Sequence, residues 1–432
     1  MSEVKVNKIS PRSGTNVQLG DSGDTITVPS GATLDASNAT TTLPANVVTT
    51  TGTQTLTNKT IDASQLTGTI TPSDNTVTPA KLAYNYNQFR NIIINGDMSI
   101  AQRGTSESGI TSVGYYTADR IKIVNEITSA VFTVSQSTDV PSGQGFSKSM
   151  KWDCTTANAS PSTGFLTVQQ IIEGQNLQYL KKGTANAEST TLSFWIKSNK
   201  TGTYVCELYD SDNNRTISQA YTISSASTWE KKTLTFAGDT TGAFNNDNDA
   251  SLYVSIFLGA GTEYTSGSLQ TSWGTRSNTK RAVGQVNLAD STSNELYITG
   301  IQLEAGTTAS DFEFLPYDVN LDRCERYYQT IIKSQDEAIC NAASFGTSTA
   351  YGVYVFRKEM RSSPSLDQTT GTSYYQYTNA GDGDNFDSFT MSLTSTRSAR
   401  FNNADSISVT TGQAGWFKQQ NSNAEMKLDA EL

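Results

Sequence analysis

Apolar residues are spaced in two different ways along this chain of 432 residues. Up to about residue 90, single aliphatic residues stand about five to ten positions apart among Thr, Ser, Asn and Gly. Beyond that point, Val, Ile, Phe, Tyr and Trp alternate with polar residues over short segments that turn residues separate. The change falls within residues 78–104, which we interpret as the junction between a thin leading segment and a head with its own core.

The leading segment has too few apolar side chains to offset the entropy of ordering a single chain. Three parallel copies would bury the aliphatic residues on a shared axis and leave Thr and Ser in water. The pattern therefore predicts an intertwined β shaft of a homotrimer over residues 21–90, with a flexible Thr/Ser linker as the alternative. The residues expected in the trimer core of this shaft are Ile26, Val28, Leu34, Leu56, Ile61, Leu66, Ile70, Val77 and Leu82.

The first residues show a shorter alternation. Val4, Val6 and Ile9 are separated by polar residues, which is typical of a half-exposed strand. Such a strand can pair with a partner's surface. We therefore interpret residues 1–20 as an attachment segment, and a frayed terminus is the alternative.

The segments after residue 90 predict an antiparallel β-sandwich. Within residues 191–198 (TLSFWIKS), Leu192, Phe194 and Ile196 fall on one face of a strand and the residues between them on the other. The β-rich segments of this kind are 130–135, 191–198, 203–209, 232–236, 252–258 and 295–303. Their number and spacing favour a jelly-roll-like sandwich over residues 91–317.

A smaller β domain is expected over residues 318–432. It begins with the best helix candidate, residues 320–333, because Leu321, Cys324, Tyr328 and Ile331 share one helical face. The strands expected after it are 350–356, 374–377, 386–391, 406–410 and 424–432. The predicted fold class is all-β with this one helix.

Charge and composition exclude several functions. With 41 acidic and 31 basic residues the net charge is −10, so we expect no nucleic-acid partner, because phosphate binding needs clustered Lys and Arg. The longest apolar runs are a few residues, far below the roughly 18 to 20 needed for membrane insertion. The first residues have no apolar signal core, so we expect synthesis in a cytoplasm.

The chemistry-bearing residues indicate binding rather than catalysis. The chain has no His, which removes His-based nucleophilic catalysis and His metal ligands. Its four Cys are scattered, so no zinc site is expected. Asp382, Asp384 and Asp387 only loosely approach a calcium loop, and a solvated turn is favoured. We expect no metal, no cofactor and no enzyme activity; a glycosidase, which needs only two carboxylates, is the enzymatic alternative.

Several short motifs, in order, resemble the tail-fibre-like proteins of bacteriophages. They are TQTLTNKTID (53–62), IIINGDMSIAQR (92–103), YTADR (116–120), YITGIQLEAGTTASDFEF (297–314), CERYYQ (324–329) and DAEL (429–432). The resemblance implies a homotrimeric virion fibre, attached through residues 1–20 to the tail or the capsid. It also implies a carbohydrate-binding-module-like sandwich and a head that binds a host-surface glycan. The alternatives are a tailspike polysaccharide depolymerase and a structural or capsid-attached fibre or adaptor without a receptor role.

Aromatic side chains are the candidates for receptor binding, because sugar rings stack their C–H faces on them. Tyr264 and Trp273 lie in a Gly/Ser/Thr-rich segment, where packing under a loop is the alternative. Tyr374, Tyr375 and Tyr377 precede an acidic turn, with Tyr375 and Tyr377 on one strand face. Packing at a trimer interface is the alternative there.

Overall fold

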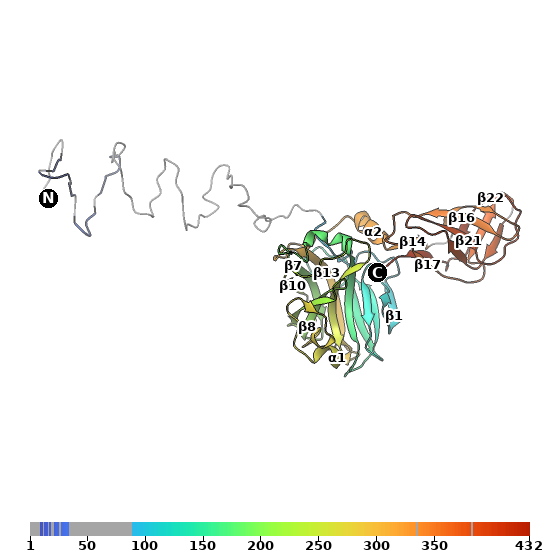
Figure 1. Ribbon diagram of the computed structural model, residues 1–432, viewed down its shortest axis with the longest axis horizontal. Helices are drawn as coiled ribbons and strands as arrows, with labels where there is room; N and C mark the ends of the chain where they lie inside the picture. The colour runs from blue at the N-terminus through green and yellow to red at the C-terminus, as the bar shows by residue number, and fades with distance from the viewer. Residues whose placement is uncertain are drawn as a thin grey trace. The chain divides into compact units, whose positions relative to one another are not determined.

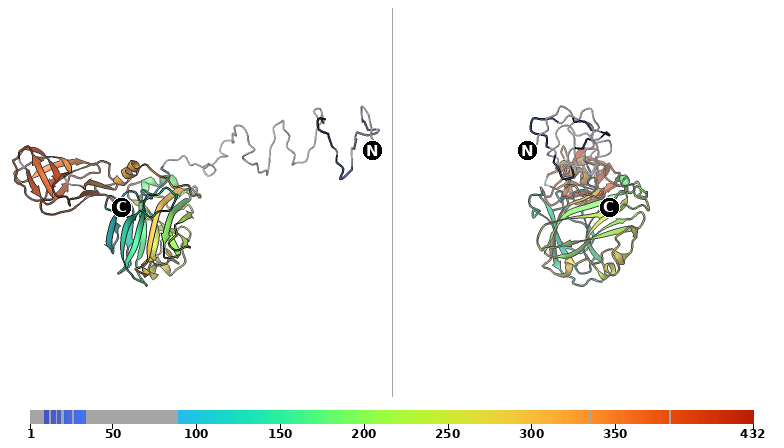
Figure 2. Two further views of the ribbon diagram at one scale, coloured as in Figure 1. Left: turned by 180° about the vertical axis from the view of Figure 1, so that it is seen from behind. Right: turned by 90° about the vertical axis from the view of Figure 1, so that its left-hand side faces the viewer.

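Two antiparallel sheets packed face to face make up most of the ordered head (Figures 1 and 2). The computed structural model describes residues 9–11, 13–15, 17–18, 21–25, 27–33, 89–333, 336–381 and 383–432. The chain divides into two units, Met1–Thr76 and Val77–Leu432. All strand pairs given below are antiparallel.

The first sheet of the sandwich has six strands and the second has seven. In spatial order the first sheet consists of β1 (Ser106–Ile110), β4 (Val131–Ser137), β5 (Ser149–Thr156), β13 (Glu295–Ala305), β7 (Thr190–Ser198) and β10 (Glu230–Phe236). The second consists of β12 (Gly274–Thr275), β9 (Arg215–Ile223), β8 (Gly202–Asp210), β11 (Ala250–Ala260), β6 (Phe165–Glu173), β3 (Lys122–Asn125) and β2 (Gly114–Tyr115). The predicted antiparallel sandwich is confirmed, and each of its six expected strands is present.

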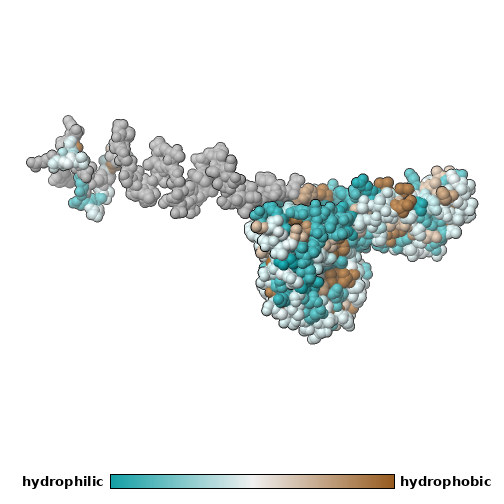
Figure 3. All heavy atoms as spheres, in the orientation of Figure 1, coloured by the Kyte–Doolittle hydropathy of each residue, from teal (hydrophilic) through white to brown (hydrophobic). Residues whose placement is uncertain are grey.

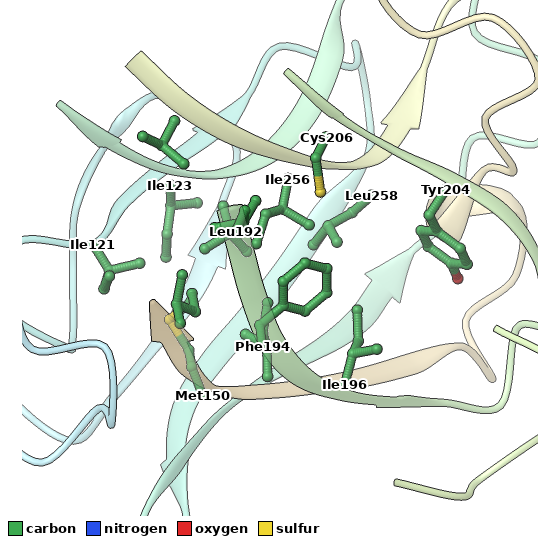
Figure 4. Packing of buried hydrophobic residues seen from close by; sticks show 14 of the residues in the cluster. Ile121, Ile123, Met150, Leu192, Phe194, Ile196, Tyr204, Cys206, Ile256 and Leu258 are labelled. Carbon is green, nitrogen blue, oxygen red and sulfur yellow. The ribbon is translucent and has the colours of Figure 1, made fainter. Parts of the chain in front are cut away.

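One apolar core lies between the two sheets. Leu192, Phe194 and Ile196 of β7 are fully buried in it, as the alternation predicts, and they meet Ile256 and Leu258 of the other sheet (Figure 4). The intervening residues of each strand face outward. The sandwich therefore presents an outer face on each sheet, and these outer faces are where a ligand has access.

Short helical turns connect the strands of the sandwich. They are η3 (Gly174–Asn176), η4 (Gln178–Leu180), α1 (Thr262–Thr265), η5 (Asn278–Lys280) and η6 (Leu288–Asp290). No helix among the described residues is long and apolar enough to cross a bilayer.

The predicted helix over residues 320–333 is half right. Helix α2 spans Tyr317–Glu325, but the rest of the predicted segment is strand β14 (Tyr328–Ile332). β14 pairs with β23 (Met426–Asp429), which also pairs with β17 (Ser365–Gln368), and this sheet buries Tyr328 and Ile332. Residues 328–332 are aromatic and β-branched, and β23 is available as a partner about a hundred residues further along the chain. They therefore form a strand despite their helical periodicity.

The other C-terminal sheet has seven strands. In spatial order they are β19 (Gly383–Phe386), β18 (Tyr375–Asn379), β22 (Ala414–Gln419), β15 (Ala338–Ser344), β16 (Ala350–Val355), β21 (Ser398–Asn403) and β20 (Phe389–Ser392). Three expected strands are found at 350–356, 374–377 and 424–432, with shifted ends. The expected strand at 386–391 is interrupted by a turn at residues 387–388: its first residue ends β19 and its last three belong to β20.

The expected strand at 406–410 is wrong. Ile407 and Val409 are buried, as their alternation predicts, and their N–H groups donate to Ser348 O and Thr347 O. These two bonds do not extend into a ladder, so the segment remains a loop that fills the core.

The leading unit has no helix or strand among its described residues. Of the predicted shaft core only Val28 is described, and its side chain is exposed in the single chain, as is Ile9 of the attachment segment. The remaining predicted residues lie outside the described residues: Val4, Val6, Ile26, Leu34, Leu56, Ile61, Leu66, Ile70, Val77 and Leu82.

Candidate functional site

The structure places Tyr375 and Tyr377 in the core of the C-terminal sheet. Both have an exposed fraction of 0%; the Tyr375 ring packs against Phe389 and the Tyr377 ring against Phe417. The Tyr375 hydroxyl donates to Thr369 O and Glu425 O, and the Tyr377 hydroxyl to Gln413 O. Their assignment to a receptor-binding surface is therefore corrected, because neither ring has a free face for a sugar. Tyr374, on the opposite strand face, is half-buried at the edge of the same core.

Tyr264 and Trp273 lie under the loop that follows β11. Tyr264 is buried, with its ring centroid 5.1 Å from that of Phe165, so its assignment to a binding surface is also corrected. Trp273 is half-buried against the sandwich core, and its Nε1 donates to Ala237 O at 2.7 Å. Packing under a loop, the alternative noted for this pair, describes both placements.

Four of the motifs that resemble tail-fibre-like proteins, at 92–103, 116–120, 324–329 and 429–432, meet between the sandwich and the C-terminal sheets. Arg120 is fully buried, forms an ion pair with Glu431, and has its guanidinium carbon 3.5 Å from the Tyr327 ring centroid. Arg103 pairs with the same Glu431 at 3.4 Å and lies 3.5 Å from the Tyr328 ring centroid. These side chains hold distant segments together rather than forming a binding surface.

Asp119 completes this group, which we call the junction cluster (Arg103, Asp119, Arg120 and Glu431). Its carboxylate accepts hydrogen bonds from Gln102 N at 2.8 Å and Gln102 Nε2 at 2.6 Å. Burial, opposed by the Gln102 hydrogen bonds and by Arg103, raises the pKa of Asp119 to about 6. Burial works against the charge of Arg120, yet Glu431 holds the pKa of that guanidinium above its ordinary value.

The outer face of the seven-stranded sheet of the sandwich carries a pair of adjacent tyrosines. Leu208 of β8 and Val254 of β11 point into the core, so their neighbours Tyr209 and Tyr253 point outward. These two tyrosines are directly opposite each other in the ladder, with ring centroids 5.5 Å apart, and both are half-buried. Two adjacent rings on a sheet give an apolar platform with a polar hydroxyl on each ring.

A row of polar side chains runs beside this platform across five strands. In ladder order its members are Lys122, Gln169, Ser255, Glu207 and Ser218. Gln169 Nε2 donates to Ser255 Oγ at 2.8 Å, and Ser218 Oγ is buried without a hydrogen bond to any described residue. Gln169, Ser255, Glu207 and Ser218 have exposed fractions of 8% or less, so this row lies beneath the surface, where a ligand does not reach it.

Arg276 closes one side of the platform. Its guanidinium carbon lies 4.4 Å from the Tyr209 ring centroid, and its Nε has no partner among the described residues. Burial raises the pKa of Tyr253 above its ordinary value, so this phenol is protonated at neutral pH. We call the two tyrosines and the guanidinium beside them (Tyr209, Tyr253 and Arg276) the tyrosine face.

Sequence reasoning missed this face because it singled out aromatics in a Gly/Ser/Thr-rich segment and in the C-terminal domain. The signal lies in two strands of the sandwich: in residues 207–210 (ELYD) and 252–255 (LYVS) a tyrosine follows a leucine that points into the core. Such a tyrosine is not needed for the core. No group of three or more acidic or Cys side chains among the described residues is placed to hold a metal.

Comparisons with known proteins find structural likeness only. No protein-family model and no curated protein matches the chain. Among solved structures, the enzymatically active domain of bacteriophage CBA120 tailspike protein 4 is 14% identical, with a TM-score of 0.27, covering 50% of this chain and 21% of that chain. A family 30 carbohydrate-binding module is 12% identical over 53% of this chain and 91% of that chain, with a TM-score of 0.27.

A further similar structure is the family 11 carbohydrate-binding module from Clostridium thermocellum in complex with a β-1,3-1,4-mixed-linked tetrasaccharide. It is 12% identical, covers 50% of this chain and 94% of that chain, and has a TM-score of 0.22. The identities and TM-scores are low throughout, so the functional conclusions rest on the residues of this chain.

Proposed function

We propose that the chain is a bacteriophage virion fibre that attaches to its host by binding a surface glycan through the tyrosine face of the sandwich. The observation that carries the proposal is the half-buried Tyr209–Tyr253 pair on the outer face of the sheet, with Arg276 beside it. The rings would take the C–H face of a sugar, and the two phenol hydroxyls and the Arg276 guanidinium its hydroxyls. The order of motifs that resembles tail-fibre-like proteins supports the virion role.

The proposed activity is binding without catalysis. Glycoside hydrolysis needs two carboxyl groups that flank the scissile bond. The carboxylate of Glu207, on the same face of the sheet, is fully buried and held by Arg281 Nε at 2.9 Å and Nη2 at 2.8 Å. A carboxylate in this position is neutralised and shielded from a bound sugar.

The proposed assembly is a homotrimer, with residues 1–20 bound to a tail or capsid protein and residues 21–90 forming the shaft. Three copies would bring three tyrosine faces to one host surface. Weak contacts with sugars would then act together, and avidity can exceed the affinity of one site by about 10² to 10⁴.

A printed array of bacterial surface polysaccharides tests the proposal. The intact protein should be retained on a subset of the glycans, and Tyr253→Ala should weaken that retention by about tenfold, because one stacking ring is lost. Tyr317→Ala removes another exposed tyrosine, outside the tyrosine face, and should bind like the unmodified protein. Equal retention of Tyr253→Ala on every bound glycan would remove the tyrosine face from the proposal.

A further inference from the structure

A cavity lies between the turns after β6, residues 89–94 and helix α2. Its volume is about 400 Å³, within the range of roughly 300 to 1,000 Å³ typical of ligand sites. Two aromatic side chains on its walls are unusually open: Phe89 has an exposed fraction of 55% and Tyr179 of 48%. Neither ring belongs to the tyrosine face.

The walls of this cavity carry more positive than negative charge. Three cationic side chains line it, Arg323, Arg326 and Lys358, against the single carboxylate of Asp322. This is unusual for a chain whose net charge is −10. The cavity is therefore suited to an anionic ligand.

Two of the three cations already have carboxylate partners. Arg326 makes a two-pronged pair with Glu173, from Nε at 2.8 Å and Nη2 at 2.7 Å. Lys358 Nζ pairs with Asp322 at the cavity wall. The positive charges of these two side chains are therefore largely balanced by the carboxylates.

Arg323 is the exception. It forms no ion pair with a carboxylate of the described residues, and its Nη2 donates only to Asn91 O at 3.3 Å. The carboxylate that acts most on it is Glu313, which instead accepts a hydrogen bond from Asn91 N. Burial lowers the pKa of Arg323 from its ordinary value, the direction expected when a guanidinium is desolvated without enough negative charge beside it.

The position of Arg323 allows one ligand to contact both its guanidinium and the aromatic rings of the cavity wall. Its guanidinium carbon lies 6.0 Å from the Phe89 ring centroid, so a group held by Arg323 also lies near an aromatic wall. A planar carboxylate matches the fork of donors on a guanidinium. The ring that carries this carboxylate would then contact Phe89 or Tyr179.

We propose that this cavity binds an acidic sugar residue, with its carboxylate on Arg323 and its ring against Phe89 and Tyr179. The site extends the proposed function to charged glycans. It uses none of the residues of the tyrosine face, so the two proposed sites can be tested independently of each other.

Ligand-observed NMR titration of the intact protein with D-glucuronate, D-glucose and inorganic phosphate tests this proposal. Glucuronate should bind more tightly than glucose by about tenfold or more, the difference made by one charge-assisted pair, and this preference should weaken at high salt. Equal binding of glucose and glucuronate would overturn the proposal. Phosphate binding as tight as that of glucuronate would also overturn it, because it would show a general anion site.

Two variants locate the site. Arg323→Gln should abolish the preference for glucuronate, whereas Arg397→Gln, which removes an exposed guanidinium outside the cavity, should keep it. Tyr179→Ala changes an exposed ring and should weaken glucuronate binding without unfolding the protein. A full preference for glucuronate in Arg323→Gln, or unchanged glucuronate affinity in Tyr179→Ala, would contradict the assignment, whatever the array result for Tyr253→Ala.

Discussion

Tyr253 and Tyr375 both lie in strands next to aliphatic or aromatic neighbours, yet only Tyr253 reaches the surface. The difference is the phase of each residue in its strand: Leu252 and Val254 fill the core beside Tyr253, whereas Tyr375 itself fills the core of its sheet. The sequence placed Tyr375 and Tyr377 on one face correctly. It did not tell which face is buried, because that depends on the second layer of the domain.

Asp119 gives a residue-scale prediction for the pH dependence of stability. Its folded pKa of about 6 lies above its ordinary value of 3.8, so the folded state takes up a proton first as the pH falls. This raised pKa contributes stability that is fully present below about 3.8 and is lost as the pH rises through about 6. Arg103 and Gln102, which favour the charged form, and Glu431, which opposes it, face this carboxylate.

The measurement compares the unfolding temperatures of the unmodified protein and Asp119→Asn at about pH 7 and about pH 4.5. When the pH is lowered, the unfolding temperature of the unmodified protein should rise relative to that of Asp119→Asn. Carboxylates with a lowered pKa, such as Glu173, are common to both proteins and largely cancel in the difference. If the difference between the two unfolding temperatures does not change with pH, or if the variant becomes relatively more stable as the pH falls, this account of Asp119 is contradicted.

At the scale of elements, local alternation was enough for the sandwich strands and failed where partners are distant. β7, β8 and β11 each have clear inward and outward positions, so their existence and faces follow from the sequence. The helical pattern of residues 320–333 predicts a helix across β14, because the partner strand β23 lies about a hundred residues further along the chain. Each outward tyrosine is visible in its own strand, but the pair that makes the tyrosine face arises only when β8 and β11 pair in register.

The junction cluster joins such distant elements and carries a prediction of its own. Glu431→Gln would leave Arg120, which is fully buried, without its carboxylate partner, and breaking a buried pair in this way costs about 3–5 kcal/mol. Urea unfolding should show this loss. Glu359→Gln, at an exposed pair with Arg397, is the matched control and should change little. A loss no larger than that of the control would mean that the cluster does not hold the junction.

For the whole molecule, the proposed trimer accounts for apolar side chains that the described part of one chain leaves uncovered. Val353 and Val355, neighbours on the outward side of β16, have exposed fractions of 63% and 71%. Figure 3 shows apolar patches on the surface of this part of the chain, among largely polar residues. Adjacent exposed apolar residues of this kind commonly mark contacts between proteins.

Native mass spectrometry of the intact chain tests the trimer. The expected species has three times the chain mass of 46.6 kDa, and it should persist when the ionic strength is raised, because the proposed contacts are apolar. A single-chain mass at micromolar protein concentration would contradict both the trimer and the shaft over residues 21–90.

The most direct measurement of the central claim is hydrogen exchange of the intact protein with and without a glycan that the array retains. Binding at the tyrosine face should slow exchange in β6, β8 and β11 and in the loop that carries Arg276, because these amides exchange when the structure opens and a bound sugar stabilises the closed state. Protection confined to other segments, with these strands unchanged, would contradict the claim that the tyrosine face of the sandwich binds the host glycan.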